Sequence, residues 1–92
     1  MPHTEMYFKT WCPYSRRALA LLSSKGIDFT AIDLTHDADE RELKMRERSG
    51  RTSVPQIFVD GRHLGGYEDI AALEAAGDLD QLLFADADLH AA

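Results

Sequence analysis

The sequence of 92 residues contains a single cysteine, Cys12. One cysteine cannot form a disulfide within the chain, so the fold has to depend on packing, as is expected in a reducing compartment. Any redox chemistry of this sulfur therefore needs a thiol or a disulfide from another molecule.

The chain also lacks a long apolar segment. No run approaches the ~20 residues needed to cross a bilayer, and the N-terminal residues do not show the basic and apolar regions of a signal peptide. We therefore expect a soluble, cytoplasmic protein that does not bind membranes. With 45% hydrophobic residues the chain suits one domain, residues 1–92, in which residues 85–92 form a frayed tail.

Basic residues are in the minority, and the net charge is −6. This charge argues against general binding to nucleic acids or to membrane surfaces, because both require a basic face. The charge is unevenly distributed, however. Residues 1–26 hold four basic side chains against Glu5 alone, a local charge of +3, so the remaining residues total −9. Cys12 lies in the basic segment, and nearby positive charge favours the thiolate form of cysteine.

The spacing of apolar and turn-forming residues predicts alternating strands and helices. We expect strands at 6–8, 29–34, 55–59 and 62–64, and helices at 13–25, 37–50, 68–76 and 78–84. Strands joined by a crossover helix pair in parallel, whereas Asp60-Gly61 predicts an antiparallel hairpin. The predicted fold class is therefore α/β, with a mixed four-stranded sheet flanked by helices.

The predicted helix ends rest on capping residues. Pro13 suits the first position of its helix and Gly26 suits the left-handed residue after the last turn. Asp37 and Glu40 have the spacing of a capping box, and Glu68 or Asp69 can cap the third helix.

Cys12 is thereby predicted at or near the N-cap of the first helix. The unpaired N–H groups and the positive dipole end of a helix N-terminus stabilise a thiolate, and Lys9 and Arg16 add positive charge. These features favour a reactive thiol over the alternative, an inert cysteine packed as a small hydrophobic residue.

Four motifs in this order resemble a bacterial class I glutaredoxin of the thioredoxin fold, over residues 5–83. They are KTWCPYS at 9–15, LLSSKG at 21–26, RSGRTSVPQIFVDG at 48–61 and GGYEDI at 65–70. The resemblance implies a glutathione-dependent thiol-disulfide oxidoreductase with glutathione as its co-substrate and no metal. It also implies glutathionylated proteins or small disulfides as substrates, and we expect a monomer.

The resemblance assigns roles to residues around Cys12. Cys12 matches the nucleophile of the family. Lys9 matches a lysine that holds the glycine carboxylate of glutathione and stabilises the thiolate, and Tyr14 matches an aromatic residue beside the cysteinyl group.

Two further segments match the glutathione site of the family. In Ser53-Val54-Pro55 the resemblance implies a cis proline, which leaves the Val54 backbone able to pair with the glutathione backbone like an added strand. Tyr67, Glu68 and Asp69 match the turn that receives the γ-glutamyl end. Family members often have Cys or Ser, then Asp or Ser, where this chain has Tyr67 and Glu68.

Ser15 occupies the position of the second, resolving cysteine of dithiol glutaredoxins. A hydroxyl cannot form a disulfide, so the expected mechanism is monothiol, through Cys12 and a second glutathione. Two origins are compatible with the sequence. Ser15 is either natural, since some members have C-P-Y-S or C-S-Y-S, or it replaces a native cysteine of a dithiol protein-disulfide reductase.

Three alternatives remain open at this point. A dimer could carry an iron-sulfur cluster ligated by two Cys12 thiolates and two glutathiones, although the family branch specialised for this usually has C-G-F-S. A glutathione transferase shares the fold but needs a helical second domain, and a non-catalytic adapter would use the fold for protein contacts. Metal-dependent hydrolysis is disfavoured because His3, His36, His63 and His90 lack the spacing of ligands.

Overall fold

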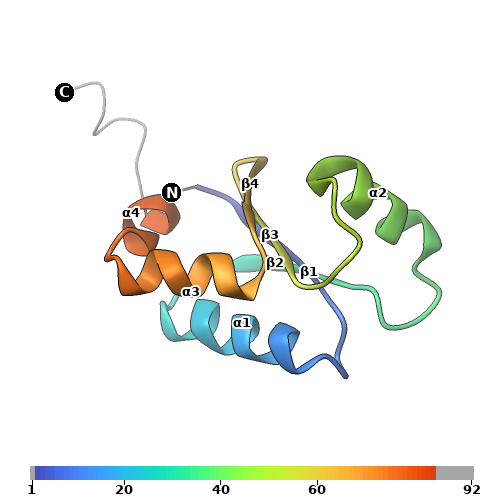
Figure 1. The fold of residues 1–92 in the computed structure, drawn as a ribbon, viewed down its shortest axis with the longest axis horizontal. Coiled ribbons are helices and arrows are strands. Elements are labelled where there is room, and N and C mark those ends of the chain that lie inside the picture. The colour runs from blue at the N-terminus through green and yellow to red at the C-terminus, as the bar shows by residue number, and fades with distance from the viewer. Residues whose placement is uncertain (1, 85–92) are drawn as a thin grey trace.

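The computed structural model describes residues 2–84 of the chain. The elements alternate as the sequence predicts (Figure 1). They are β1 (Thr4–Phe8), α1 (Pro13–Ser24), β2 (Phe29–Asp33), α2 (Asp39–Ser49), β3 (Gln56–Val59), β4 (Arg62–Gly65), α3 (Tyr67–Ala75) and α4 (Leu79–Phe84). Within these residues, no helix has the length and apolar character required to cross a bilayer.

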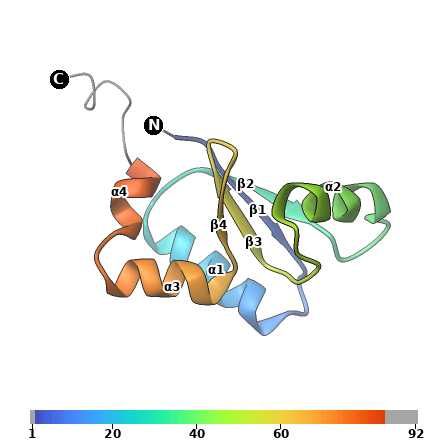
Figure 2. The same ribbon diagram turned by 45° about the horizontal axis from the view of Figure 1, so that its top comes forward.

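The four strands form one sheet in the order β2-β1-β3-β4 (Figure 2). β1 pairs in parallel with β2 and antiparallel with β3, and β3 pairs antiparallel with β4. The prediction of a mixed four-stranded sheet is therefore confirmed. β1 and β3 are the central strands, and their side chains supply apolar residues to both faces.

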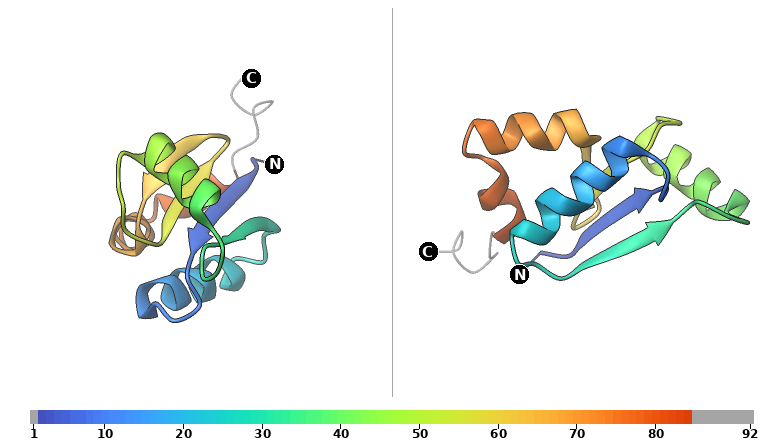
Figure 3. Two further views of the ribbon diagram at one scale, coloured as in Figure 1. Left: turned by 90° about the vertical axis from the view of Figure 1, so that its right-hand side faces the viewer. Right: turned by 90° about the horizontal axis from the view of Figure 1, so that it is seen from below.

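The helices cover the two faces of the sheet unequally. α1 and α3 lie side by side on one face and α2 lies on the other, as the end-on view shows (Figure 3). Met6 and Ile57 belong to the core beneath α1, α3 and α4, whereas Tyr7 and Phe58 belong to the smaller core beneath α2. This division follows from the alternation of side chains along a strand.

One predicted helix cap, at Asp37, is wrong. Asp37 has a φ of 47°, in the left-handed region, and α2 begins only at Asp39 with Ala38 as its N-cap. Asp37 therefore lies in the preceding turn and cannot act as a capping residue. Gly66 is the N-cap residue of α3, and the Asp69 side chain caps this helix by accepting the Gly66 N–H, as predicted for Asp69. The predicted tail, residues 85–92, lies outside the described residues.

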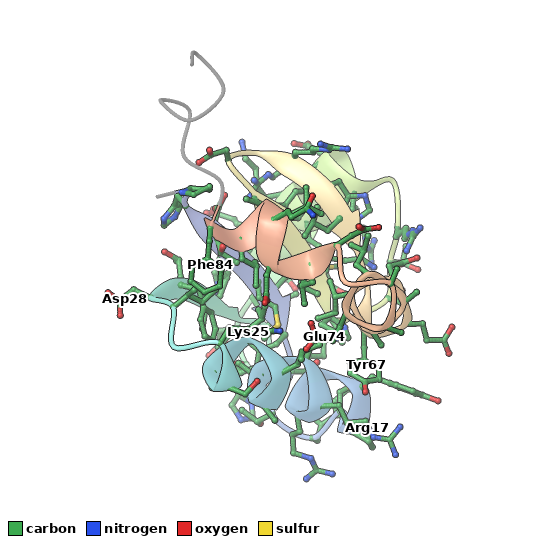
Figure 4. All side chains as sticks on the ribbon, turned by 90° about the vertical axis from the view of Figure 1, so that its left-hand side faces the viewer. Arg17, Lys25, Asp28, Tyr67, Glu74 and Phe84 are labelled. Atoms are coloured by element: carbon green, nitrogen blue, oxygen red, sulfur yellow. The ribbon has the colours of Figure 1, made fainter. Side chains whose placement is uncertain are left out.

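One charged cluster joins the three helices on the larger core. Lys25, directly after α1, places its Nζ 2.6 Å from Glu74 Oε1 on α3 and 2.7 Å from Asp80 Oδ1 on α4 (Figure 4). Hydrogen bonds to Asp80 and then Glu74 raise the pKa of Lys25. The ammonium group thus connects the C-terminal end of α1 to the α3–α4 corner.

Candidate functional site

Cys12 is the N-cap of α1, as its position before Pro13 predicts. Its backbone is extended, with φ −82° and ψ 119°, and its carbonyl accepts the Arg16 N–H at 3.1 Å. The side chain is 7% exposed. The sulfur therefore lies at a helix start, close to N–H groups that have no partner within the helix.

The surroundings of Cys12 lower the pKa of its thiol. Burial is the largest influence and raises the pKa, but the N–H and the hydroxyl of Ser15, the N–H of Tyr14 and the charge of Arg16 together outweigh burial. The lowered pKa increases the fraction of thiolate, which is the nucleophilic form of cysteine.

Ser15 lies in the first turn of α1 and is fully buried. Its Oγ accepts a hydrogen bond from the Lys9 N–H at 3.2 Å, so the hydroxyl connects the loop before Cys12 to the helix after it. The hydroxyl also interacts with the Cys12 sulfur and lowers the pKa of the thiol. Ser15 therefore supports the thiolate, a role that its match to the resolving cysteine did not suggest.

Lys9 contacts two residues that do not line the pocket, Glu42 and Trp11. Its Nζ lies 3.8 Å from Glu42 Oε1 on α2 and 5.6 Å from the centre of the Trp11 ring. The positive charge of Arg16 lowers the pKa of Cys12, and the role of Lys9 toward glutathione stays a prediction. The sequence could not predict the Glu42 contact, because Lys9 and Glu42 are 33 positions apart.

A pocket of about 230 Å³ opens beside Cys12, between the loop before β3 and the start of α3. Seven of the eight residues predicted to contact glutathione line it, and Lys9 is the exception. The structure thus brings together Tyr14, Ser53, Val54, Pro55, Tyr67, Glu68 and Asp69. The rings of Tyr14 and Tyr67 face each other across its edge, with their centres 6.4 Å apart.

The Val54–Pro55 peptide bond is cis, as the resemblance implied. β3 begins at Gln56, so Val54 lies outside the ladder of the sheet and forms part of the pocket wall. The Cys12 thiol donates a weak hydrogen bond to the Val54 carbonyl, with a sulfur-to-oxygen distance of 3.8 Å. The nucleophile and the pocket are therefore adjacent.

The opposite end of the pocket contains a carboxylate with a fixed orientation. Asp69 Oδ2 accepts hydrogen bonds from the Gly66 N–H at 2.8 Å and from Arg51 Nη1 at 3.0 Å. The Gly66 N–H and then Arg51 lower the pKa of Asp69, so this group is ionised at neutral pH. Gly65 has a φ of 120°, and a Cβ at this position would overlap the Asp69 carboxylate.

Sequence reasoning missed three residues of the pocket wall: Arg51, Gln56 and Gly66. Arg51 and Gln56 flank the predicted Ser53-Val54-Pro55 segment, so their position in the sequence was a usable signal. Among residues 2–84, no three His, Cys, Asp or Glu side chains gather closely enough to hold a metal ion. His90 lies outside the described part of the chain.

Comparisons with known proteins agree with this geometry. The sequence model of the glutaredoxin family matches residues 4–64. Glutaredoxin 3 of Escherichia coli (strain K12) is 53% identical over 83 residues, which cover 90% of this chain and 99% of the relative.

Solved structures with the same fold include two of interest. The solution structure of glutaredoxin from Brucella melitensis has a TM-score of 0.78 and 46% identity, covering 90% of this chain and 89% of that one. A crystal structure of a buckwheat glutaredoxin–glutathione complex has a TM-score of 0.79 and 25% identity, with coverages of 89% and 76%.

Proposed function

The chain belongs to the glutaredoxin family, whose members are glutathione-dependent thiol-disulfide oxidoreductases, and from this premise we propose that it reduces glutathione mixed disulfides by a monothiol mechanism. The observation that carries the proposal is the contrast between two residues in one helical turn. Cys12 has a lowered pKa beside the pocket, whereas Ser15, buried behind it, cannot form a disulfide.

The reaction consists of two thiol-disulfide exchanges. In the first, the Cys12 thiolate attacks the glutathione sulfur of the mixed disulfide, and the substrate sulfur leaves as a thiolate that takes a proton from solvent. In the second, the thiolate of a free glutathione attacks the glutathione sulfur bound to Cys12. This step releases oxidised glutathione and regenerates the Cys12 thiolate. One half of the oxidised glutathione comes from the mixed disulfide and the other from the free glutathione, so each cycle consumes one free glutathione.

Two groups of the pocket wall can hold glutathione: the Val54 backbone and the Asp69 carboxylate. The Val54 backbone, which lies outside the sheet, suits pairing with the cysteinyl part of the tripeptide, and the ionised Asp69 suits the γ-glutamyl ammonium group. The volume of about 230 Å³ is below the ~300–1,000 Å³ of enclosed small-molecule sites. We therefore place only the cysteinyl and γ-glutamyl parts inside it, and the glycine carboxylate outside, within reach of Lys9.

Mass spectrometry after incubation with oxidised glutathione tests the proposal. We expect one glutathione adduct, located on Cys12, that is removed by reduced glutathione. The Cys12→Ala variant should form no adduct and should not turn over a glutathione mixed disulfide. Turnover by Cys12→Ala, or wild-type protein that forms no adduct, would refute the assignment.

The iron-sulfur carrier remains the competing prediction for this site. Cluster ligation would require Cys12 sulfurs from two chains to meet, and Cys12 is 7% exposed with Tyr14 beside it. Anaerobic reconstitution with glutathione distinguishes the two functions, because a carrier would give a coloured dimer and the proposed enzyme a colourless monomer. The cytoplasmic location and the protein substrates also stay predictions.

A further inference from the structure

A series of partly buried hydrogen bonds connects β4 to the loop that contains Val54. His63 Nε2 lies 2.6 Å from Gln56 Oε1, and Gln56 Nε2 donates to the Ser53 carbonyl at 3.0 Å and to the Ser53 hydroxyl at 3.3 Å. Gln56 is 1% exposed and directly follows the cis proline. These hydrogen bonds thus reach Ser53, the residue before Val54. The Val54 carbonyl in turn lies next to the Cys12 sulfur.

The donors and acceptors of His63, Gln56 and Ser53 allow only one orientation of the Gln56 amide. The Ser53 carbonyl can only accept, so the Gln56 amide has to present its NH₂ group to Ser53 and its oxygen to His63. The Gln56 oxygen can only accept, so His63 has to carry a proton on Nε2. Because a charged imidazole also has this proton, the hydrogen bond is compatible with both protonation states of His63.

The position of His63 is set by its regular pairing with Phe58 across the hairpin, and the register shifts only beyond this pair. Phe58 pairs with His63, but Ile57 pairs with Gly65, so Leu64 is an extra residue in β4. The His63 ring packs against the Phe58 ring, with centres 5.0 Å apart and an interplanar angle of 34°. This packing directs Nε2 toward Gln56 rather than toward solvent.

The charged groups near His63 shift its pKa in opposite directions. Burial lowers the pKa of His63, the positive charge of Arg51 lowers it further, and the negative charge of Asp69 raises it. The ring is therefore neutral at neutral pH, and its proton lies on Nε2.

We propose that His63 and Gln56 are positioning residues for the reaction at Cys12, because they hold the Ser53 carbonyl and thereby the Val54 backbone in the orientation that receives glutathione. This inference rests on the proposed function. Neither side chain reacts. Gln56 lines the pocket, whereas His63 contacts Gln56 and Phe58 and does not line it.

Three variants separate positioning from general stabilisation. Gln56→Met keeps the length of the side chain and removes its hydrogen bonds, and His63→Phe keeps a ring on Phe58 and removes the donor. Each should raise KM for a glutathione mixed disulfide about two- to tenfold with kcat within about twofold, as expected for one lost neutral hydrogen bond that orients bound substrate. His63→Gln restores an N–H donor and should recover most of the wild-type KM.

A double-mutant cycle tests whether the two residues act as one chain. Once Gln56→Met has removed the link to Ser53, adding His63→Phe should raise KM no further. Single effects that multiply in the double variant would overturn the proposal, as would unchanged KM in both single variants. Arg62→Ala, an exposed neighbour on β4, is the matched control and should leave KM unchanged.

A second readout does not depend on turnover. In the reduced protein, the backbone amide NMR signals of Ser53 and Val54 should shift in Gln56→Met and His63→Phe and return toward wild type in His63→Gln. Unmoved signals would overturn the positioning role. If wild-type protein failed to reduce the mixed disulfide while these signals behaved as described, the proposed function would be refuted and the hydrogen-bond chain would stand.

Discussion

The Cys12 sulfur lies 3.8 Å from the Val54 carbonyl oxygen, across 42 positions of sequence. This contact joins the start of α1 to the loop before β3, and it places the nucleophile at the wall of the pocket. An attacking thiolate needs both activation and a substrate sulfur held in line with it.

Ser15→Ala should raise the pKa of Cys12, because it removes a hydrogen bond from a hydroxyl to the thiolate. The rate of alkylation by iodoacetamide, measured against pH, reports this value. Ser24→Ala removes an exposed hydroxyl near the other end of α1 and should leave the profile unchanged. Coincident profiles for Ser15→Ala and wild type would show that Ser15 does not support the thiolate.

Ser15→Cys should add reduction of protein disulfides to the activity. The introduced thiol can attack the mixed disulfide between Cys12 and a substrate protein, a step that a hydroxyl cannot perform. Thiol titration should show that both thiols are lost together on oxidation. The Ser15→Ala variant is the control and should remain weak with protein disulfides. Equal activity of the two variants would contradict the monothiol interpretation of Ser15.

Gly65→Ala should disturb the Asp69 end of the pocket. The φ of 120° is unfavourable for alanine, and the new Cβ would displace the Asp69 carboxylate from the Gly66 N–H. We expect a loss of about 2 kcal/mol or more in the free energy of unfolding, together with a higher KM for the mixed disulfide.

Gly61→Ala is the matched control for this strain. Gly61 has a φ of 78°, but a Cβ there would meet no atom within 4 Å. Gly61→Ala should lower the free energy of unfolding by about 1 kcal/mol and leave KM unchanged. If both variants changed KM equally, the overlap with Asp69 would not be the cause.

Glu42→Gln should lower KM for the glutathione mixed disulfide about twofold at low salt. The substitution removes the carboxylate that pairs with Lys9, so the ammonium group becomes available to the glycine carboxylate. A partly exposed ion pair is worth only ~0.2–1 kcal/mol, which limits the effect. Glu40→Gln removes an exposed acidic residue of the same helix and provides the control. An unchanged or higher KM in Glu42→Gln alone would exclude competition for Lys9.

Arg48→Met should destabilise the protein at neutral pH by about 1–3 kcal/mol, since Arg48 donates to both oxygens of Glu5 at 2.9 and 3.2 Å. The hydrogen bond from Arg48 lowers the pKa of Glu5, against the effect of burial. This stabilisation is complete above the unfolded pKa of about 4.3 and is lost as pH falls through the lower folded pKa.

Urea unfolding at two pH values measures this dependence. The difference in unfolding free energy between wild type and Arg48→Met should shrink between pH 7 and about pH 2.5. Arg46→Met removes only an exposed pair with Glu42 and should have a small effect at both pH values. A difference that stayed constant with pH would mean that Arg48 acts through packing on Phe58 rather than through Glu5.

Local features of the sequence were sufficient to predict the elements and the position of the nucleophile. Strand alternation, Pro13 and Gly26 determine where β1 and α1 lie, because these signals act over a few residues. The exact helix starts were less predictable. Asp37 has the spacing of a capping residue, but the turn before α2 places it in a left-handed conformation.

The motifs from residue 9 to residue 70 also identified the family and seven of the residues that line the pocket. Only the tertiary structure decided which charges and hydrogen bonds act there. Lys9 pairs with Glu42, Arg51 orients Asp69, and His63 reaches Ser53 through Gln56. These partners come from different elements, so their contacts depend on how the sheet and helices pack, and no spacing along the chain encodes a distance across the fold.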